Sequence, residues 1–187
     1  MNKLEESLAI NPIIAAIRDE KDLKKACESK ALIVFILFGN IMNIPKISKI
    51  LKDAGKTVFI HMDMIDGLKG DLAAIHYIKK FTEPEGIITI KSSNVKHAKQ
   101  LGLNTIHRMF IVDSLSLKTG IRNAFEVKPE AIEVMPGVSS KIITNIQEKV
   151  KVPIIAGGLI QDKNDIYEAL NAGAVAISTT CSDLWNM

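Results

Sequence analysis

Short runs of apolar, mostly β-branched residues alternate along the chain with longer segments whose apolar positions recur at the helical period. This alternation is typical of βαβ units, in which helices bury both faces of a parallel sheet. The apolar runs predict eight strands: 13–17, 32–37, 57–61, 86–90, 105–110, 131–134, 153–156 and 174–178. The segments between them predict seven helices: 19–28, 43–54, 70–81, 93–101, 114–125, 139–149 and 162–172.

Eight strands that alternate with helices predict a (β/α)₈ barrel of the TIM type. An internal similarity supports this count, because the Pro-Ile-Ile-Ala segment at 12–15 recurs at 153–156. The second copy carries two extra residues within 157–160, directly after its strand, where a barrel widens a loop to admit a ligand. A doubly wound open sheet is the competing architecture.

Length and composition add limits to this prediction. The 187 residues, 47% of them hydrophobic, suit one domain over 1–187 with short loops, since such barrels commonly have about 250 residues. The net charge of +3 neither indicates nor excludes nucleic-acid binding. Cys27 and Cys181 are far apart, and the polar N-terminal segment does not resemble a secretory leader. No apolar run reaches the ~20 residues of a membrane span, so we expect a cytoplasmic protein.

Glycine and hydroxyl residues follow the last two predicted strands. Glycine lets backbone N–H groups approach an anion closely, hydroxyls add donors, and segment 182–185 adds a helix N-terminus. Taken singly, each motif would be only a tight turn or a helix cap. Because neighbouring strands of a barrel end at the same face, both loops together predict a phosphate site. The predicted phosphate-binding residues are Gly137, Gly157, Gly158, Ser178, Thr179 and Thr180.

Charged and polar residues also stand in or after predicted strands three to six. An ionised group inside a parallel sheet is costly to bury unless it is paired, so these residues predict an interlocked polar network at the barrel mouth. The network is predicted to consist of His61, Asp63, Lys91, Arg108 and Glu133. Since His107 and Arg108 are adjacent, only one of them is expected to face the interior. His76 and His97 are expected on solvated helix surfaces.

No metal site and no complete catalytic set is predicted. Zinc and iron sites need three or more converging ligands, and His61 and Asp63 have no counterpart after strand seven. The Asp63-Met64-Ile65-Asp66 segment lacks the lysine of the DxKxxD motif of decarboxylase barrels. An enzyme remains an alternative: an isomerase, epimerase or lyase of a small phosphorylated substrate, with Lys91, Asp63 and Glu133 as its reactive groups.

Six segments in sequence order resemble the glycerol uptake operon antiterminator family, over nearly the whole chain. They are His61-Met62-Asp63 with 66–68, 86–91, Arg108-Met109-Phe110 with 113–114, 133–137, 155–160, and 177–180 with Leu184-Trp185. Met64, Ile65 and Ile90 are small departures from the family's usual pattern. The resemblance implies a barrel without a cofactor that senses glycerol 3-phosphate. It also implies binding to the leader mRNA of glycerol-utilisation genes, which prevents premature termination.

The residues themselves indicate no RNA-binding module, since no RNP-type aromatic sheet, GXXG clamp or arginine-rich arm is visible. Lys46, Lys49 and Lys52 repeat at a spacing of three, with Lys56 close behind, so this helix face is a candidate RNA contact. A solvated helix face is the simpler interpretation. A barrel that binds only a ligand or a partner protein is a third alternative, and the sequence leaves homo-oligomer formation open.

Overall fold

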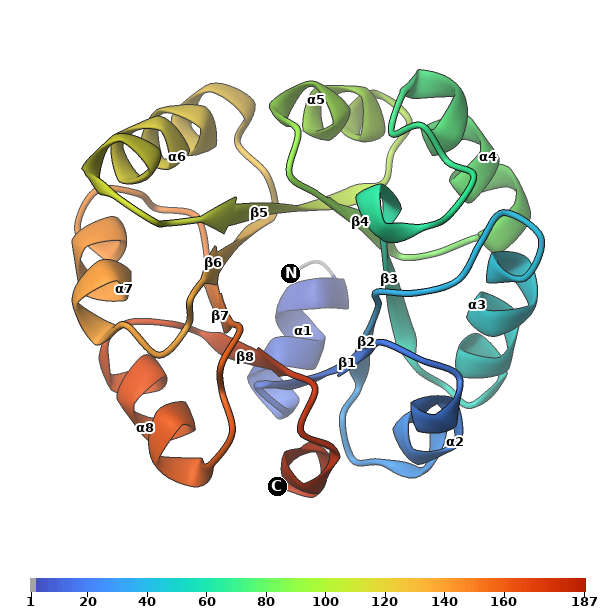
Figure 1. The fold of residues 1–187 in the computed structure, drawn as a ribbon, viewed down its shortest axis with the longest axis horizontal. Coiled ribbons are helices and arrows are strands. Elements are labelled where there is room, and N and C mark those ends of the chain that lie inside the picture. Colours follow the sequence, from blue (N-terminus) through green and yellow to red (C-terminus); the bar gives the residue numbers. More distant parts are fainter. Residues whose placement is uncertain (1–2) are drawn as a thin grey trace.

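The computed structural model describes residues 3–187. Eight parallel strands close into a barrel in chain order, and β1 pairs with β8 through Ile14 and Ser178 (Figure 1). The strands are β1 (Ile13–Ile17), β2 (Ile33–Ile36), β3 (Thr57–His61), β4 (Gly86–Thr89), β5 (Asn104–Phe110), β6 (Ala131–Met135), β7 (Ile154–Gly157) and β8 (Ala176–Thr179). The predicted (β/α)₈ barrel is confirmed, and the open sheet is excluded because its first and last strands would be unpaired.

Helices surround the barrel and lie within two residues of the predicted bounds. They are α2 (Lys21–Glu28), α3 (Ile44–Asp53), α4 (Leu72–Thr82), α5 (Ser92–Gln100), α6 (Ser114–Val127), α7 (Ser140–Gln147) and α8 (Lys163–Asn171). Two further elements were not predicted: α1 (Lys3–Ile10) and the 3₁₀ helix η1 (Met62–Met64). The helical segment predicted at 182–185 is the 3₁₀ helix η2 (Ser182–Asn186). No helix in residues 3–187 is both long and apolar enough to cross a membrane.

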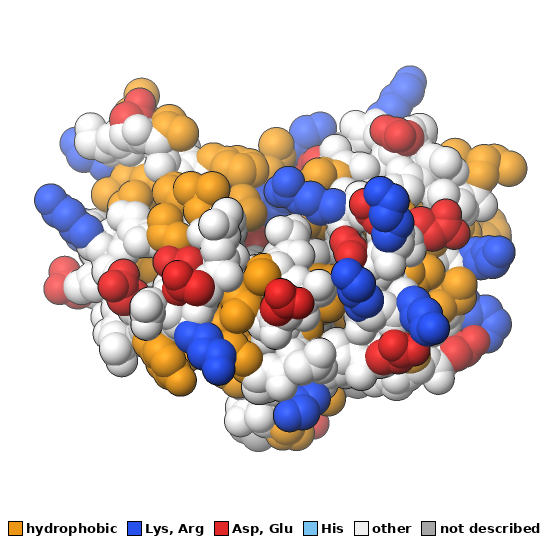
Figure 2. All heavy atoms as spheres, turned by 60° about the horizontal axis from the view of Figure 1, so that its bottom comes forward, with side chains coloured by type: hydrophobic (Ala, Val, Ile, Leu, Met, Phe, Trp, Pro, Cys, Tyr) orange, Lys and Arg blue, Asp and Glu red, His pale blue; other side chains and the backbone are white. Residues whose placement is uncertain are grey.

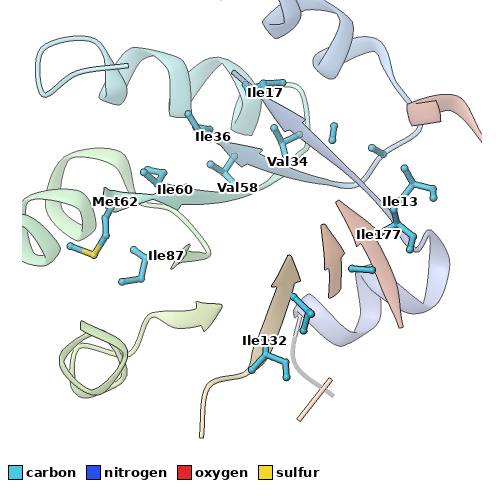
Figure 3. Close-up of a cluster of buried hydrophobic side chains, with 14 of the residues drawn as sticks. Ile13, Ile17, Val34, Ile36, Val58, Ile60, Met62, Ile87, Ile132 and Ile177 are labelled. Carbon is cyan, nitrogen blue, oxygen red and sulfur yellow. The ribbon is translucent and has the colours of Figure 1, made fainter. Parts of the chain in front are cut away.

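The alternation of side chains along each strand divides the core into two layers. One face of the strands packs against the surrounding helices, as Ile36, Val58 and Ile60 do (Figure 3). The other face fills the barrel interior, where Phe35 and Phe59 meet edge to face at 5.9 Å. Because both layers are apolar, the polar side chains that do enter the interior stand out as candidates for function.

Helix α1 closes one end of the barrel. Its Leu4 and Leu8 belong to the apolar cluster of the interior, and the helix ends just before β1 begins. In Figure 1 it is seen behind the centre of the ring of strands, at their N-terminal ends. The opposite end, where the strands finish and the helices begin, therefore provides the access to the interior.

Candidate functional site

A cavity of about 410 Å³ opens at the C-terminal end of the barrel, and we call it the mouth cavity. Its size suits a small metabolite. It is lined by Ala16, Arg18, Leu37, Arg108, Phe110, Val112, Glu133, Met135, Pro136, Gly158, Leu159, Ile160, Gln161, Ser178, Thr179 and Thr180. Phe110, Val112 and Leu159 are 54%, 84% and 68% exposed at its rim. Figure 2 shows hydrophobic side chains gathered over the upper left of the molecule, whereas charges of both signs mix on its right.

A buried ion pair forms the floor of the mouth cavity. Arg108 and Glu133 are register partners on β5 and β6, and Nε of Arg108 donates a 2.6 Å hydrogen bond to Oε2 of Glu133. Oγ of Ser178 on β8 donates a 2.5 Å hydrogen bond to Oε1 of the same carboxylate. Nη2 of Arg108 is buried and has no hydrogen-bond partner among the described residues. The floor therefore keeps one guanidinium donor available.

Gly157 makes room for this arrangement. A Cβ at this position would lie 2.5 Å from Oγ of Ser178 and 2.7 Å from Oε1 of Glu133. Both distances are far shorter than ordinary contacts, so a side chain here would force the hydrogen bond apart. The absence of a side chain at Gly157 thus leaves the space that the buried Glu133–Ser178 hydrogen bond occupies.

The loops after β7 and β8 bring unpaired backbone donors to the lining of the mouth cavity. Gly158 and Leu159 have φ values of +79° and +63°, and the left-handed conformation is unfavourable for leucine by roughly 1–2 kcal/mol. Among the described residues, the backbone N–H groups of Gly158, Leu159 and Thr180 have no acceptor. Backbone strain and free donors in one cavity are typical of an anion-binding loop.

Arg18 adds a cation to the same side of the cavity. It follows β1 and continues the inward-facing positions Ile14 and Ala16. Because Ala15 is the register partner of Thr179, Arg18 lies beside the end of β8. Arg18 was not predicted from the sequence, although the alternation along β1 places it at the mouth.

Other members of the predicted phosphate set are engaged within the protein. The N–H of Gly137 donates to the carbonyl of Gly157 at 2.6 Å, and Gly137 does not line the mouth cavity. The hydroxyl of Thr179 donates to the carbonyl of Ile160 at 2.8 Å, so it ties the two loops together. The hydroxyl proton of Ser178 is committed to Glu133, as described above. Of the predicted set, Gly158 and Thr180 keep free donors.

Asp63 and Lys91 make their contacts outside the mouth cavity, whereas Arg108 and Glu133 line it. Asp63 Oδ2 accepts hydrogen bonds from Oγ1 of Thr89 at 2.8 Å and from the N–H of Ile90 at 2.9 Å. Nζ of Lys91 lies 3.3 Å from the carbonyl of Gly70. Lys91 continues the outward-facing positions of β4, so it points toward the loop before α4 instead of into the barrel. These residues form a separate cluster that fastens neighbouring loops.

His61 lies between the two clusters at the end of β3 and is 2% exposed. Its Nδ1 is 4.0 Å from Oδ2 of Asp63 and has no hydrogen-bond partner among the described residues. Burial and the nearby positive charge of Arg108 lower the pKa of His61 to about 4, although Asp63 acts in the opposite direction. The imidazole is therefore neutral at neutral pH and adds no charge to the site.

The remaining histidines were predicted with mixed success. Arg108 lines the mouth cavity, whereas Nε2 of His107 is 3.3 Å from the carbonyl of Ile90, so only one of the adjacent pair serves the cavity. Burial lowers the pKa of His107. His76 is exposed as predicted, but His97 is half-buried and its Nδ1 has no partner among the described residues. Helix α5 packs closely enough against the sheet to cover that ring.

Comparison with known proteins shows the family of this chain. The sequence model of the glycerol-3-phosphate responsive antiterminators matches residues 13–185. The chain belongs to this family. An uncharacterized protein of Escherichia coli K12, YgcP, is 41% identical over 177 residues, which cover 95% of this chain and 93% of the relative.

Solved structures of antiterminator proteins share the architecture. The glycerol uptake operon antiterminator regulatory protein of Listeria monocytogenes superposes with a TM-score of 0.90 at 30% identity and covers 94% of this chain and 95% of its own. A related protein of Thermotoga maritima gives 0.83 at 36% identity, with 94% and 98% covered. An N-acetylmannosamine-6-phosphate 2-epimerase of Clostridium perfringens, at 15% identity and a TM-score of 0.70, shares the fold alone.

Two absences bear on what this family member can do chemically. Within residues 3–187, no group of three or more His, Cys, Asp or Glu side chains is arranged to hold a metal ion. Cys27 and Cys181 are both free thiols.

Most lysines of the face considered as an RNA contact already have partners within this protein. Lys49 pairs with Asp53 at 2.7 Å, and Lys52 pairs with Glu83 at 3.0 Å. Nζ of Lys56 donates to the carbonyls of Ser29 and Ala31. Local compensation of this kind lowers the potential that a nucleic acid would meet, which weakens the case for this face.

Proposed function

We propose that this protein is a glycerol 3-phosphate-responsive antiterminator that binds leader mRNA of glycerol-utilisation genes and has no catalytic turnover. The observation that carries the proposal is the set of unpaired donors around the mouth cavity. Backbone N–H groups of Gly158, Leu159 and Thr180 supply neutral donors, and Arg18 supplies charge. Charge-assisted hydrogen bonds of this kind contribute about 1.5–3 kcal/mol each, so a few suffice to bind a small phosphate ester.

The glycerol part of the ligand fits the floor of the same cavity. Nη2 of Arg108 can donate to a ligand hydroxyl, and the oxygens of Glu133 retain lone pairs beyond those used by Arg108 and Ser178. The apolar side chains of Leu37 and Met135 then flank the carbon chain. A polar floor opposite a phosphate site discriminates glycerol 3-phosphate from inorganic phosphate, which would leave the floor unused.

Regulation follows from linkage between the ligand and RNA. Glycerol 3-phosphate can strengthen RNA binding only if it favours a protein state that RNA also favours. The exposed loops after β5 and β7 provide both rim and wall of the mouth cavity, so they are the segments most directly changed by an occupied site. By reciprocity, RNA must raise the affinity for the ligand by the same factor.

The decisive experiment is a titration of labelled leader RNA from a glycerol-utilisation operon of the same genome, with and without glycerol 3-phosphate. Salt is held constant because nucleic-acid affinity depends strongly on it. The expected result is tighter RNA binding with the metabolite and no change with glycerol or inorganic phosphate. Gly158→Val is the matched control, since a bulky residue at a φ of +79° should remove the metabolite effect without unfolding the barrel.

The same preparation tests the enzyme alternative. A panel of triose and pentose phosphates would be incubated with the protein and followed for turnover. We expect none, because Lys91 contacts the loop at Gly70 and is not part of the mouth cavity. Turnover of any of these substrates by the unaltered protein, without any RNA binding, would overturn the antiterminator proposal.

A further inference from the structure

A shallow, open cleft lies along helix α6, on the side where the chain leaves α7, on the outside of the barrel. It has a volume of about 560 Å³ and is lined by Lys118, Ile121, Arg122, Phe125, Glu126 and Lys149. We call it the α6–α7 cleft. Phe125 is 55% exposed, close to the 52% of Phe81 and the 54% of Phe110.

The sequence of α6 places these side chains on one face. Lys118, Arg122 and Phe125 are separated by four and three residues, which is the spacing of neighbours along a helix surface. Lys149, just beyond the end of α7, faces them across the cleft. An aromatic ring is thus flanked by cations from two elements.

The charges of the α6–α7 cleft are poorly compensated. Three cations face one carboxylate, Glu126, whose Oε1 is 3.9 Å from Nε of Arg122. Both members of that pair are more than half exposed, and exposed pairs at this distance contribute little. Lys149 donates only to the neutral side chain of Asn145. The cleft therefore favours a polyanionic ligand.

We propose that the α6–α7 cleft binds a single-stranded segment of RNA. A base stacks on the exposed ring of Phe125, and Lys118, Arg122 and Lys149 contact the phosphates on either side. Aromatic platforms flanked by cations are the general means by which proteins hold unpaired nucleotides. The inference rests on the proposed antiterminator function and assigns it a surface.

A comparable cleft between α3 and α4 serves as a contrast. It has about 550 Å³ and contains Phe81, which is 52% exposed. Its lysines Lys49 and Lys52 are held in short ion pairs. Nζ of Lys80 lies 5.3 Å from the centre of the Phe81 ring, and Tyr77 packs beside it at 4.8 Å. Two carboxylates, Asp53 and Glu83, hold two of the lysines there at 2.7 and 3.0 Å, whereas the one carboxylate of the α6–α7 cleft is 3.9 Å from its nearest cation.

The position of α6 also connects the cleft with the mouth cavity. Phe110 and Val112 line that cavity, and the next residue, Asp113, caps α6 through a hydrogen bond from the N–H of Ser116 at 2.7 Å. A ligand that moves the loop after β5 therefore acts on the first turn of the helix that carries Lys118 and Phe125.

The test compares the affinity of the full-length protein and its variants for the leader RNA at fixed salt. Phe125→Ala should weaken binding by about 5- to 100-fold, the loss expected for one stacked base. Phe81→Ala, matched in residue type and exposure, should leave the affinity unchanged. Lys118→Gln and Lys149→Gln should each lower the slope of log Kd against log salt by about 0.7.

A spectroscopic variant reports stacking directly. Trp185 is the only tryptophan and is fully buried, so Phe125→Trp adds one exposed fluorophore that RNA should quench. This inference alone would be overturned if Phe125→Ala bound RNA as tightly as the unaltered protein. It would also be overturned if only Phe81→Ala lost RNA affinity. Absence of RNA binding by the unaltered protein with metabolite present would overturn the proposed function together with it.

Discussion

Arg108 and Glu133 pair inside the barrel as direct register partners, with 4% and 0% of their surfaces exposed. Such a pair is costly to desolvate, and its two charges are stable in the interior only while each has the other. Because Ser178 also donates to Glu133, three neighbouring or facing strands depend on one carboxylate.

Removing the carboxylate charge should destabilise the fold severely. Glu133→Gln leaves Arg108 buried without a counter-ion, so the free energy of unfolding in urea should fall by about 3–5 kcal/mol. The double variant Arg108→Met with Glu133→Gln should recover part of this loss. Arg122→Met, which breaks an exposed pair with Glu126, should change stability by less than ~0.5 kcal/mol. Equal losses of stability in Glu133→Gln and Arg122→Met would contradict the expectation that the buried ion pair matters more than the exposed one.

Arg18→Gln should weaken glycerol 3-phosphate binding without loss of stability. Arg18 is exposed at the rim of the mouth cavity, so its removal costs one charge-assisted contact, or roughly a 10- to 100-fold increase in Kd by calorimetry. Lys21→Gln, a nearby exposed cation next to Asp19, is the control and should bind normally. An unchanged Kd in Arg18→Gln would remove this residue from the site.

The two glycines after β7 should respond differently to alanine. In Gly157→Ala the new Cβ meets Ser178 Oγ and Glu133 Oε1 at under 3 Å, so unfolding free energy should fall by about 1–3 kcal/mol and ligand binding with it. In Gly158→Ala the nearest atom is Cε of Met135 at 3.4 Å, and the φ of +79° costs about 1 kcal/mol. Urea unfolding gives the loss of unfolding free energy in each variant. A larger loss in Gly158→Ala than in Gly157→Ala would contradict this prediction.

Stability should decline in mild acid because of His61. Its pKa of about 4 in the folded protein is below the ~6.5 of an unfolded chain, so the unfolded state binds the extra proton between these values. The stability that comes from a neutral, buried His61 is therefore complete above pH 6.5 and is lost as pH falls toward 4. We expect a loss of about 2 kcal/mol between pH 7 and pH 5. His107 acts in the same direction, so His61→Gln should flatten the profile only in part.

Trp185 should report occupation of the mouth cavity. Its Nε1 donates to the carbonyl of Thr179 at 2.8 Å, one residue before Thr180, whose N–H is available to the ligand. Saturation with glycerol 3-phosphate should therefore shift or quench its emission. The titration should give the same Kd as calorimetry, and the signal should vanish in Gly158→Val. Unchanged emission at saturation would show that the ligand does not contact the loop at Thr180.

Much of the fold was predictable because a parallel barrel repeats one simple pattern. Buried β-branched runs and intervening amphipathic helices set the strand count, and the period of two required that only one of His107 and Arg108 face the interior. The same period, applied to β4, puts Lys91 on the outward face with Ile87, and along β1 it puts Arg18 at the mouth. This local signal was present at both residues but was not used in the prediction.

Other features of the site depend on contacts that no local pattern encodes. Whether a donor is free is decided by acceptors far away in the chain: Ile160 for the hydroxyl of Thr179, and Gly157 for the N–H of Gly137. The sequence of helix α1 likewise shows only a weak helical period of apolar residues. The helix is stabilised by the contacts of Leu4 and Leu8 in the barrel interior, which the local sequence does not reveal.

That short helix has a kinetic consequence. Because Leu4 and Leu8 of α1 fill the N-terminal end, a ligand of the mouth cavity and the water that it displaces would exchange through the C-terminal opening. The rim residues Val112 and Leu159 then set entry and departure together. Changes there should alter association and dissociation rates in parallel. Under the proposed function, the duration of the response could then be tuned independently of the metabolite concentration.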